Sequence, residues 1–171
     1  MELSSLVGLA GFILVTFLAA AGGAAFPPGA WYEGLKKPGW RPPNWLFAPA
    51  WTTLYILMGV AAWLVWRAVG FAGGGVPLGL YLLQLLLNAA WTPIFFGLRK
   101  PNLAFFEIVL LWLAIAATIA AFHAVDTVAA WLLVPYLAWV TFAACLNLAI
   151  WRLNPKDSIG PAKQPGRPSP Q

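Results

Sequence analysis

The chain has 171 residues, of which 61% are hydrophobic and only 9% charged, with a formal net charge of +5. So few charged side chains cannot cover the surface of a water-soluble protein of this length, which excludes soluble enzymes and indicates a protein of the lipid bilayer. In a membrane protein an excess of positive charge reflects the orientation of the chain in the bilayer and contact with anionic lipid. We therefore expect no nucleic-acid partner.

Five apolar segments are long enough to cross a bilayer as helices, because a hydrocarbon core of roughly 30 Å needs about 20 helical residues. None of them shows the strict alternation of a membrane β-barrel. The sequence therefore predicts an all-α fold, one membrane bundle of five transmembrane helices within residues 1–153. The predicted helices are 3–26, 45–66, 76–98, 103–124 and 128–151.

The first segment, 3–26, shares one feature with a secretory signal, because small residues from Ala19 to Ala25 offer a plausible cleavage point. However, no Lys or Arg precedes it, Glu2 is acidic, and its apolar run exceeds the usual length of about 7 to 15 residues. We therefore expect it to form the first transmembrane helix.

The connection 27–44 is polar but rich in proline and aromatic residues. Proline fixes φ and removes a backbone donor, so this connection is predicted to hold one shape. Its rings suit a membrane surface or a flat apolar ligand. We predict a stiff aromatic lid over the bundle, with cationic groups at its mouth. The residues concerned are Trp31, Tyr32, Trp40, Pro38, Pro42, Pro43, Lys36, Lys37 and Arg41.

Glu107 and His123 are the only ionisable residues within the five segments. An acid in a membrane helix is a functional candidate as a proton carrier or polar anchor. Glu107 is also compatible with a shallow position in which it reaches the interface or pairs with Arg99 or Lys100. One histidine excludes a bis-histidine haem, and the single Cys145 excludes a disulfide or a thiolate cluster, so we expect no metal and no resident cofactor.

Three of the segments combine proline and tryptophan with an amide or a hydroxyl side chain. An amide that faces lipid costs about 1 to 3 kcal/mol, so Gln84, Asn88 and Asn147 should point inward together with their tryptophan neighbours. Such an inward stripe predicts an aromatic pocket, although plain packing remains an alternative, and other tryptophans fit an interfacial belt. The stripes are Trp51 and Tyr55; Gln84, Asn88, Trp91 and Phe95; Pro135, Trp139, Ala143 and Asn147. The belt is Trp45, Trp66, Trp131 and Trp151.

The distribution of basic residues predicts the orientation. If the five helices alternate in direction, every Lys and Arg except Arg67 falls on the face that carries the 27–44 connection. The positive-inside rule then places the amino terminus outside and the carboxyl terminus in the cytoplasm, in the cell membrane of a bacterium. Residues 154–171 are rich in Pro, Gly, Ser and Gln, which predicts a disordered cytoplasmic tail.

These motifs together resemble the TspO/MBR family of tryptophan-rich sensory proteins over about residues 5–153. The resemblance implies a five-helix, usually dimeric membrane protein that binds porphyrins, sterols and benzodiazepine-type ligands in a pocket under the first loop. It assigns the pocket to Tyr32, Trp51, Tyr55, Asn88, Trp91, Trp139, Ala143 and Asn147. The motifs are Trp31-Tyr32, Lys37-Pro38, Trp40, Pro42-Pro43, Trp45, Ala50-Trp51, Asn88, Trp91, Pro135-Tyr-Leu-Ala-Trp139, Leu146-Asn147 and Trp151-Arg152.

The resemblance leaves three functions open. The first is a receptor or transporter of porphyrin or haem with a role in tetrapyrrole and stress regulation. The second is light-driven porphyrin breakdown with Trp51 and Trp139 as the reacting residues, and the third is a proton-coupled carrier of small molecules or sterol that uses Glu107. The cholesterol motif of animal members has a Tyr that is missing before Arg152 here, so high-affinity sterol binding is not expected.

Overall fold

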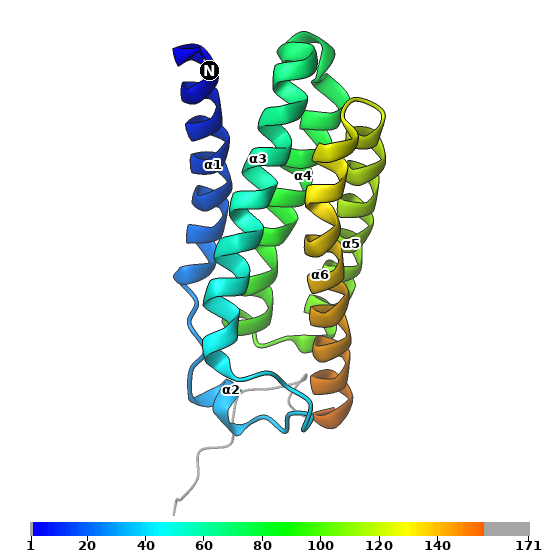
Figure 1. The fold of residues 1–171 in the computed structure, drawn as a ribbon. Coiled ribbons are helices and arrows are strands. Elements are labelled where there is room, and N and C mark those ends of the chain that lie inside the picture. Colours follow the sequence, from blue (N-terminus) through cyan, green and yellow to red (C-terminus); the bar gives the residue numbers. More distant parts are fainter. Residues whose placement is uncertain (1, 156–171) are drawn as a thin grey trace, which may run out of the picture.

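The computed structural model describes residues 2–155, whose long helices run side by side in one bundle (Figure 1). The part of the predicted tail from residue 156 onward lies outside the described residues. The elements are α1 (Leu3–Ala24), α2 (Ala30–Gly34), the 3-10 turn η1 (Asn44–Leu46), α3 (Phe47–Gly73), α4 (Gly75–Thr92), the π-helical turn η2 (Pro93–Gly97), α5 (Pro101–His123) and α6 (Thr127–Leu153).

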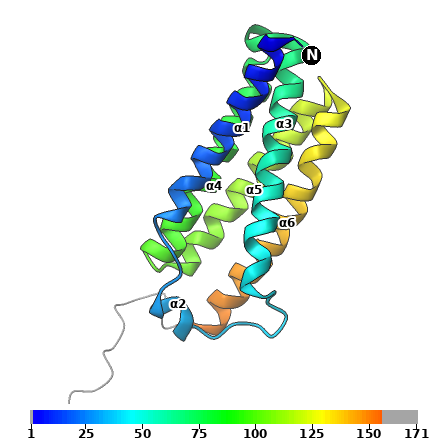
Figure 2. The same ribbon diagram turned by 60° about the vertical axis from the view of Figure 1, so that its left-hand side comes forward.

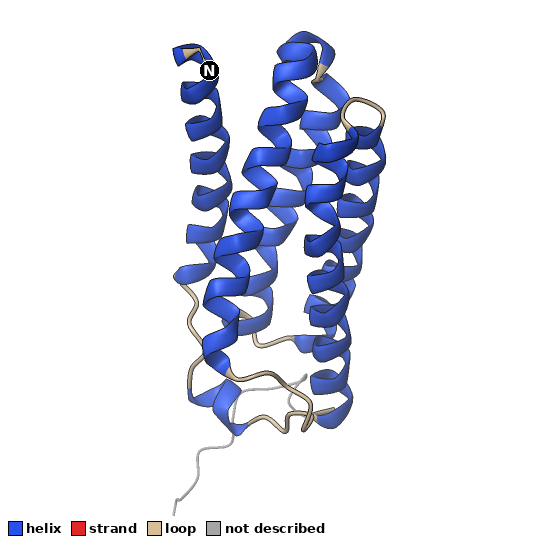
Figure 3. Cartoon of the chain, in the orientation of Figure 1, coloured by secondary structure: helices blue, strands red, loops and turns tan. Residues whose placement is uncertain are grey.

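Five of these helices are long and apolar enough to cross a membrane, which confirms the predicted all-α fold. Within residues 2–155 the chain contains helices and connections and no strands, as Figure 3 shows. α1 packs on α3 and α4, α5 contacts both α4 and α6, and α3 contacts α6 (Figure 2). The short helix α2 and its flanking segments lie at the end of the bundle where α6 finishes.

α3 is kinked at Gly70, whose φ of 65° and ψ of −172° are not helical, but it runs on to Gly73, beyond the predicted end at residue 66. The prediction ended there because Arg67 interrupts the apolar run. In the structure the Arg67 guanidinium lies over the Trp63 ring, 4.6 Å from its centroid, so the helix accommodates the charge without ending. α6 begins at Thr127, one residue before the predicted start, and the Asp126 carboxylate caps it by accepting a hydrogen bond from the Ala129 N–H at 2.9 Å.

α1 approaches α3 closely because Gly59 has no side chain. A Cβ at Gly59 would lie only 2.9 Å from the Cα of Ile13, so any larger residue would force the two helices apart. Two hydrogen bonds fix α1 along its length. The indole of Trp63 donates to the Ser5 carbonyl at 2.9 Å, and the buried hydroxyl of Thr16 bonds with that of Tyr81.

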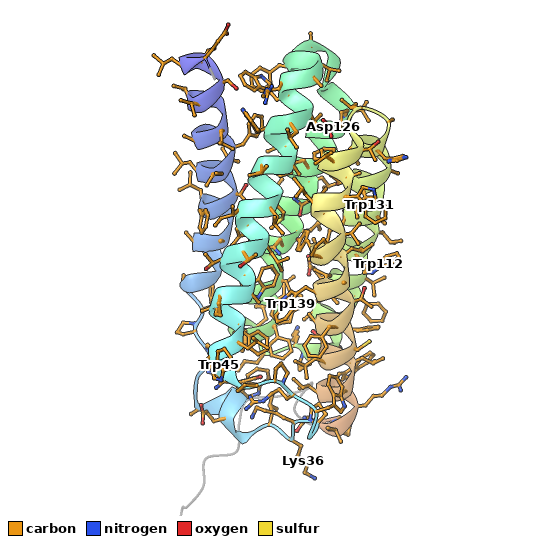
Figure 4. All side chains as sticks on the ribbon, viewed as in Figure 1. Lys36, Trp45, Trp112, Asp126, Trp131 and Trp139 are labelled. Carbon is orange, nitrogen blue, oxygen red and sulfur yellow. The ribbon has the colours of Figure 1, made fainter. Side chains whose placement is uncertain are left out.

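The predicted interfacial tryptophans fall into two groups. Trp45 and Trp131 are 70% and 66% exposed, as an outward-facing ring requires, and both are labelled in Figure 4. Trp66 and Trp151 are half-buried instead. Trp66 packs on Phe12 at a centroid separation of 6.0 Å, so it serves the packing of α1 on α3 rather than only an outer belt.

Candidate functional site

A cavity of about 490 Å³ lies at the loop end of the bundle, between α3, α4, α5 and α6. This volume is within the range of about 300 to 1,000 Å³ that small-molecule sites occupy. All eight residues predicted to form a pocket line it, together with loop residues and Ile108 and Leu111 of α5. The eight are Tyr32, Trp51, Tyr55, Asn88, Trp91, Trp139, Ala143 and Asn147.

Aromatic rings form most of the cavity wall. Trp51 of α3 stacks on Tyr55 one turn later, with ring centroids 5.3 Å apart, and meets Trp139 of α6 edge-on at 6.4 Å. On the α4 side Trp91 stacks on Phe95 at 4.9 Å. The rings predicted on separate helices therefore converge on one interior space, lined by flat faces and ring edges. Pro135, which was predicted to share the inward stripe of α6, is instead exposed on the outer surface, so that part of the prediction is wrong.

The π-helical turn η2 shapes the α4 side of the cavity. Pro93 has no N–H to donate to the helix, and the backbone bond that closes the turn runs from the Leu98 N–H to the Pro93 carbonyl at 2.8 Å. This wider turn lets the adjacent residues Phe95 and Phe96 both line the cavity. Wide turns of this kind are found often at functional sites.

A chain of side-chain hydrogen bonds crosses the bundle at the level of Asn88. The hydroxyl of Tyr55 donates to Asn88 Oδ1 at 3.1 Å, and Asn88 Nδ2 donates to the hydroxyl of Tyr136 at 3.0 Å. These bonds tie α3 to α4 and α4 to α6. Gln84 also points inward as predicted, with 1% exposure, but it lies outside the cavity lining.

Three buried polar atoms of the cavity residues have no hydrogen-bond partner among the described residues. They are the indole nitrogens of Trp91 and Trp139 and the side-chain oxygen of Asn147, whose Nδ2 donates to the Pro101 carbonyl at 2.7 Å. An unpaired buried polar atom costs about 1 to 3 kcal/mol. A ligand with an acceptor for the indoles and a donor for Asn147 would remove that cost.

The loop supplies two cations to the cavity mouth. Lys37 lies over the Tyr32 ring, 4.6 Å from its centroid, and Arg41 donates to the Tyr32 hydroxyl at 3.4 Å. Partial burial, and then the nearby Arg41, lower the pKa of Lys37, while Glu33 opposes that shift. Lys36, predicted to join them, points away from the bundle in Figure 4 and lines no part of the cavity.

Asn154 fastens the loop to the end of α6. Its Oδ1 accepts from the Lys36 N–H at 2.9 Å, and its Nδ2 donates to the Lys36 carbonyl and the Ile150 carbonyl, each at 2.8 Å. The prediction that the disordered tail starts at residue 154 is wrong for this residue, which is 5% exposed. Composition could not show it, because a single Asn beside a Pro-rich stretch carries no signal of a distant partner.

We expect Asn154→Ala to expose the loop to trypsin. Of the three basic loop residues only Lys36 offers a cleavable bond, because a proline follows both Lys37 and Arg41. The lost bonds contribute about 1 kcal/mol each, so cleavage after Lys36 should become about tenfold faster or more. Mass spectrometry of the fragments measures this rate.

The matched control is Asn154→Asp, which still accepts from the Lys36 N–H but no longer donates to either carbonyl. Its cleavage rate should fall between those of the parent and the alanine variant. Equal rates in all three proteins would show that Asn154 does not hold the loop.

Glu107 is buried in α5, with 8% exposure, and neither of its carboxylate oxygens has a hydrogen-bond partner within residues 2–155. The interpretation of a shallow residue that pairs with Arg99 or Lys100 is therefore wrong. Glu107 does not line the cavity, although its neighbour Ile108 does. It remains an inward-facing acid of unassigned role.

The cavity also contains residues that the sequence did not identify. Ile108 and Leu111 could not be distinguished from lipid-facing residues, because α5 is apolar on all sides. In a regular helix two adjacent residues point in different directions, so the inward position of Phe95 did not predict an inward position for Phe96. The wide turn η2 explains why both rings line the cavity. Phe47 lies at the start of α3, where its ring meets Trp139 edge-on at 5.7 Å.

Comparison with known proteins gives consistent matches along the chain. A family model described as TspO/MBR family matches residues 8–152. Protein CrtK of Rhodobacter capsulatus is 46% identical over 155 residues, which is 90% of this chain and 96% of that protein. Translocator protein of Homo sapiens is 46% identical over 149 residues, 84% of this chain and 88% of that protein. Tryptophan-rich sensory protein of Cereibacter sphaeroides is 45% identical over 147 residues, 83% of this chain and 91% of that protein.

Proposed function

Because this chain belongs to the TspO/MBR family and is an integral multi-pass membrane protein, we propose that it is a membrane receptor for porphyrins and other flat apolar ligands, which bind in the cavity under the loop. One observation carries this proposal: the cavity of about 490 Å³ is walled by aromatic rings from α3, α4 and α6. Flat conjugated ligands gain both stacking and burial against such walls.

The two cations of the loop outnumber the one carboxylate beside them in the cavity lining, Glu33, and so favour an anionic ligand with its charge at the loop. Lys37 and Arg41 stand at the mouth, where the carboxylates of a porphyrin could meet them while the macrocycle lies against Trp51, Trp91 and Trp139. The lowered pKa of Lys37 adds to this argument, since a nearby carboxylate would relieve the unfavourable environment of its ammonium. The indole nitrogens without partners would orient an acceptor of the ligand.

Titration of the purified protein with protoporphyrin, haem and a sterol, followed by tryptophan fluorescence, tests the proposal. We expect protoporphyrin to quench the emission saturably with one ligand per chain, because Trp51, Trp91 and Trp139 line the cavity. The sterol should bind more weakly, since it offers no carboxylate to Lys37 and Arg41. Quenching that rises linearly, without saturation, for all three ligands would contradict the proposal.

We also propose that the loop end faces the cytoplasm. α3 and α5 start at this end and α6 finishes there, so Lys37, Arg41, Arg99, Lys100 and Arg152 gather on it, whereas Arg67 lies towards the other end of α3. The positive-inside rule then favours a cytoplasmic carboxyl terminus in the cell membrane. A fluorescent protein fused to that terminus should fluoresce, and its failure to do so beside a fluorescent cytoplasmic control would contradict this orientation.

A further inference from the structure

A second hollow lies on the outer side of the bundle, between α3 and α6. It is a shallow depression that is open to the outside, and most of its lining is apolar. Its one hydroxyl, on Thr53, is already used in a hydrogen bond of 2.9 Å to the Pro49 carbonyl. The ten lining residues, several of them exposed on the bundle surface, are Leu46, Pro49, Ala50, Thr53, Leu54, Leu57, Pro135, Ala138, Trp139 and Phe142. We call this hollow the α3–α6 groove.

Trp139 is the single described residue that lines both the α3–α6 groove and the interior cavity. Figure 4 shows it between the ribbons of α3 and α6, in the half of the bundle nearer the loop. The indole of this residue therefore forms the wall between the interior cavity and an outer surface that meets the lipid.

This wall is held by packing and, among residues 2–155, by no side-chain hydrogen bond. The indole nitrogen of Trp139 has no hydrogen-bond partner in the described part of the chain, whereas those of Trp63 and Trp112 donate at 2.9 and 2.8 Å. Packing holds Trp139: its ring meets Phe47 and Phe142 at 5.7 Å and Trp51 at 6.4 Å, and it lies half-buried against the hydrophobic core. Such ring pairs are worth about 0.5 to 1.5 kcal/mol each beyond the area that they bury, so a rotamer change of Trp139 has to break packing contacts but none of the side-chain hydrogen bonds of the described residues.

Pro135 weakens the backbone one turn before Trp139. It lies inside α6 and has no N–H, so the carbonyl of Trp131 lacks its usual helical partner. A helix bends most readily at such a point. The small side chain of Ala138, next to Trp139, leaves the groove open beside the indole.

The loop that covers the end of the cavity is held more firmly than the Trp139 side chain. Asn154 fastens the loop to α6 by bonds to the Lys36 backbone and to Ile150, while Lys37 donates to the carbonyls of Glu33 and Leu35 at 3.0 Å. Access through the loop would break these bonds together. Access beside Trp139 would break none.

We propose that the α3–α6 groove is a lateral portal: a flat apolar ligand dissolved in the bilayer docks in it and reaches the cavity when Trp139 swings aside. The proposal rests on the proposed function and adds the source of the ligand and its route. A groove with a mostly apolar lining, whose one hydroxyl is already hydrogen-bonded, suits a ligand that arrives from the hydrocarbon, and it leads to the residue that closes the cavity.

The portal is tested by filling the groove without touching the cavity. In Ala138→Trp, reconstituted in lipid vesicles, stopped-flow quenching by protoporphyrin should show association and dissociation slowed by the same factor, about tenfold. The equilibrium Kd should stay constant, because a barrier on the route changes neither end state. Leu86→Trp, at a 70% exposed position of α4, is the matched control and should match the parent protein.

A reversible version guards against misfolding of Ala138→Trp. Cys145 is the only cysteine of the chain, so Ala138→Cys in a Cys145→Ala background carries one reactive thiol. Attaching a benzyl group there through a disulfide should slow association about tenfold, and a reductant should restore the rate in the same sample.

The outcomes separate the two proposals. Absence of binding by the parent protein would overturn the proposed function and the portal with it. Binding with unchanged rates in both blocked proteins would overturn the portal alone. A raised Kd with unchanged association would overturn it as well, because Ala138 would then touch the bound ligand. Faster association in Asn154→Ala, with no effect of the blocks, would assign access to the loop.

Discussion

Replacing Trp51 and Trp139 together by alanine is expected to weaken protoporphyrin binding by about tenfold or more. The two rings meet at 6.4 Å in the cavity wall, so their removal takes away stacking faces on α3 and α6 at once. Each ring contact contributes about 0.5 to 1.5 kcal/mol beyond the apolar area that it buries, and 1.4 kcal/mol corresponds to a factor of ten in Kd.

The control for this prediction is the double variant Trp45→Ala with Trp131→Ala. It also removes two indoles, but both are largely exposed and neither lines the cavity. Its Kd should equal that of the parent protein, and circular dichroism should show the same helix content in both doubles. An unchanged Kd in Trp51→Ala with Trp139→Ala would end the assignment of the cavity as the binding site.

Asn88→Leu is expected to lower the free energy of unfolding by about 1 to 3 kcal/mol. The substitution leaves the Tyr136 hydroxyl, which is fully buried, without its donor, and it removes the acceptor of Tyr55. When a buried hydroxyl loses its hydrogen-bond partner, the free energy needed to remove it from water is no longer offset. Thermal denaturation in detergent measures the loss as a lower midpoint.

Adding Tyr136→Phe to Asn88→Leu should recover part of that stability, because the orphaned hydroxyl is then removed. This recovery distinguishes the hydrogen bond from a simple packing defect. If the double variant were less stable than Asn88→Leu by the full cost of Tyr136→Phe alone, the two residues would be energetically independent.

The sequence predicted the spans and most of the site because its strongest signals were physical requirements. An amide that faces lipid is costly, so Asn88 and Asn147 were predicted to point inward. Trp91 and Ala143 lie three or four residues away on the same helix faces, so they were predicted to point inward as well. Their exposures in the structure agree with this, at 7% for Asn88 and 2% for Asn147. The five spans followed from the lengths of the apolar segments, because each is long enough to cross the hydrocarbon core as a helix.

Other features depended on contacts between distant parts of the chain. α2 (Ala30–Gly34) is too short to show a helical pattern in a proline-rich segment, and the partner of Asn154 is 118 residues away. The wide turn η2 arises where Pro93 interrupts a helix, but the pattern alone does not tell a kink from a wide turn. The apolar pattern of α5 could not show which of its faces points inward, because apolar residues suit both the lipid and the protein interior.

The missing side chain at Gly59 has a consequence for the size of ligand that fits. Ala20, on the same helix as Ile13, forms part of the cavity wall, so the spacing of α1 from α3 sets the width of the chamber on that side. A methyl group added at residue 59 would push α1 outward and widen the chamber without altering any residue that lines it. A contact between two helices outside the lining thus contributes to the dimensions of the chamber on its α1 side.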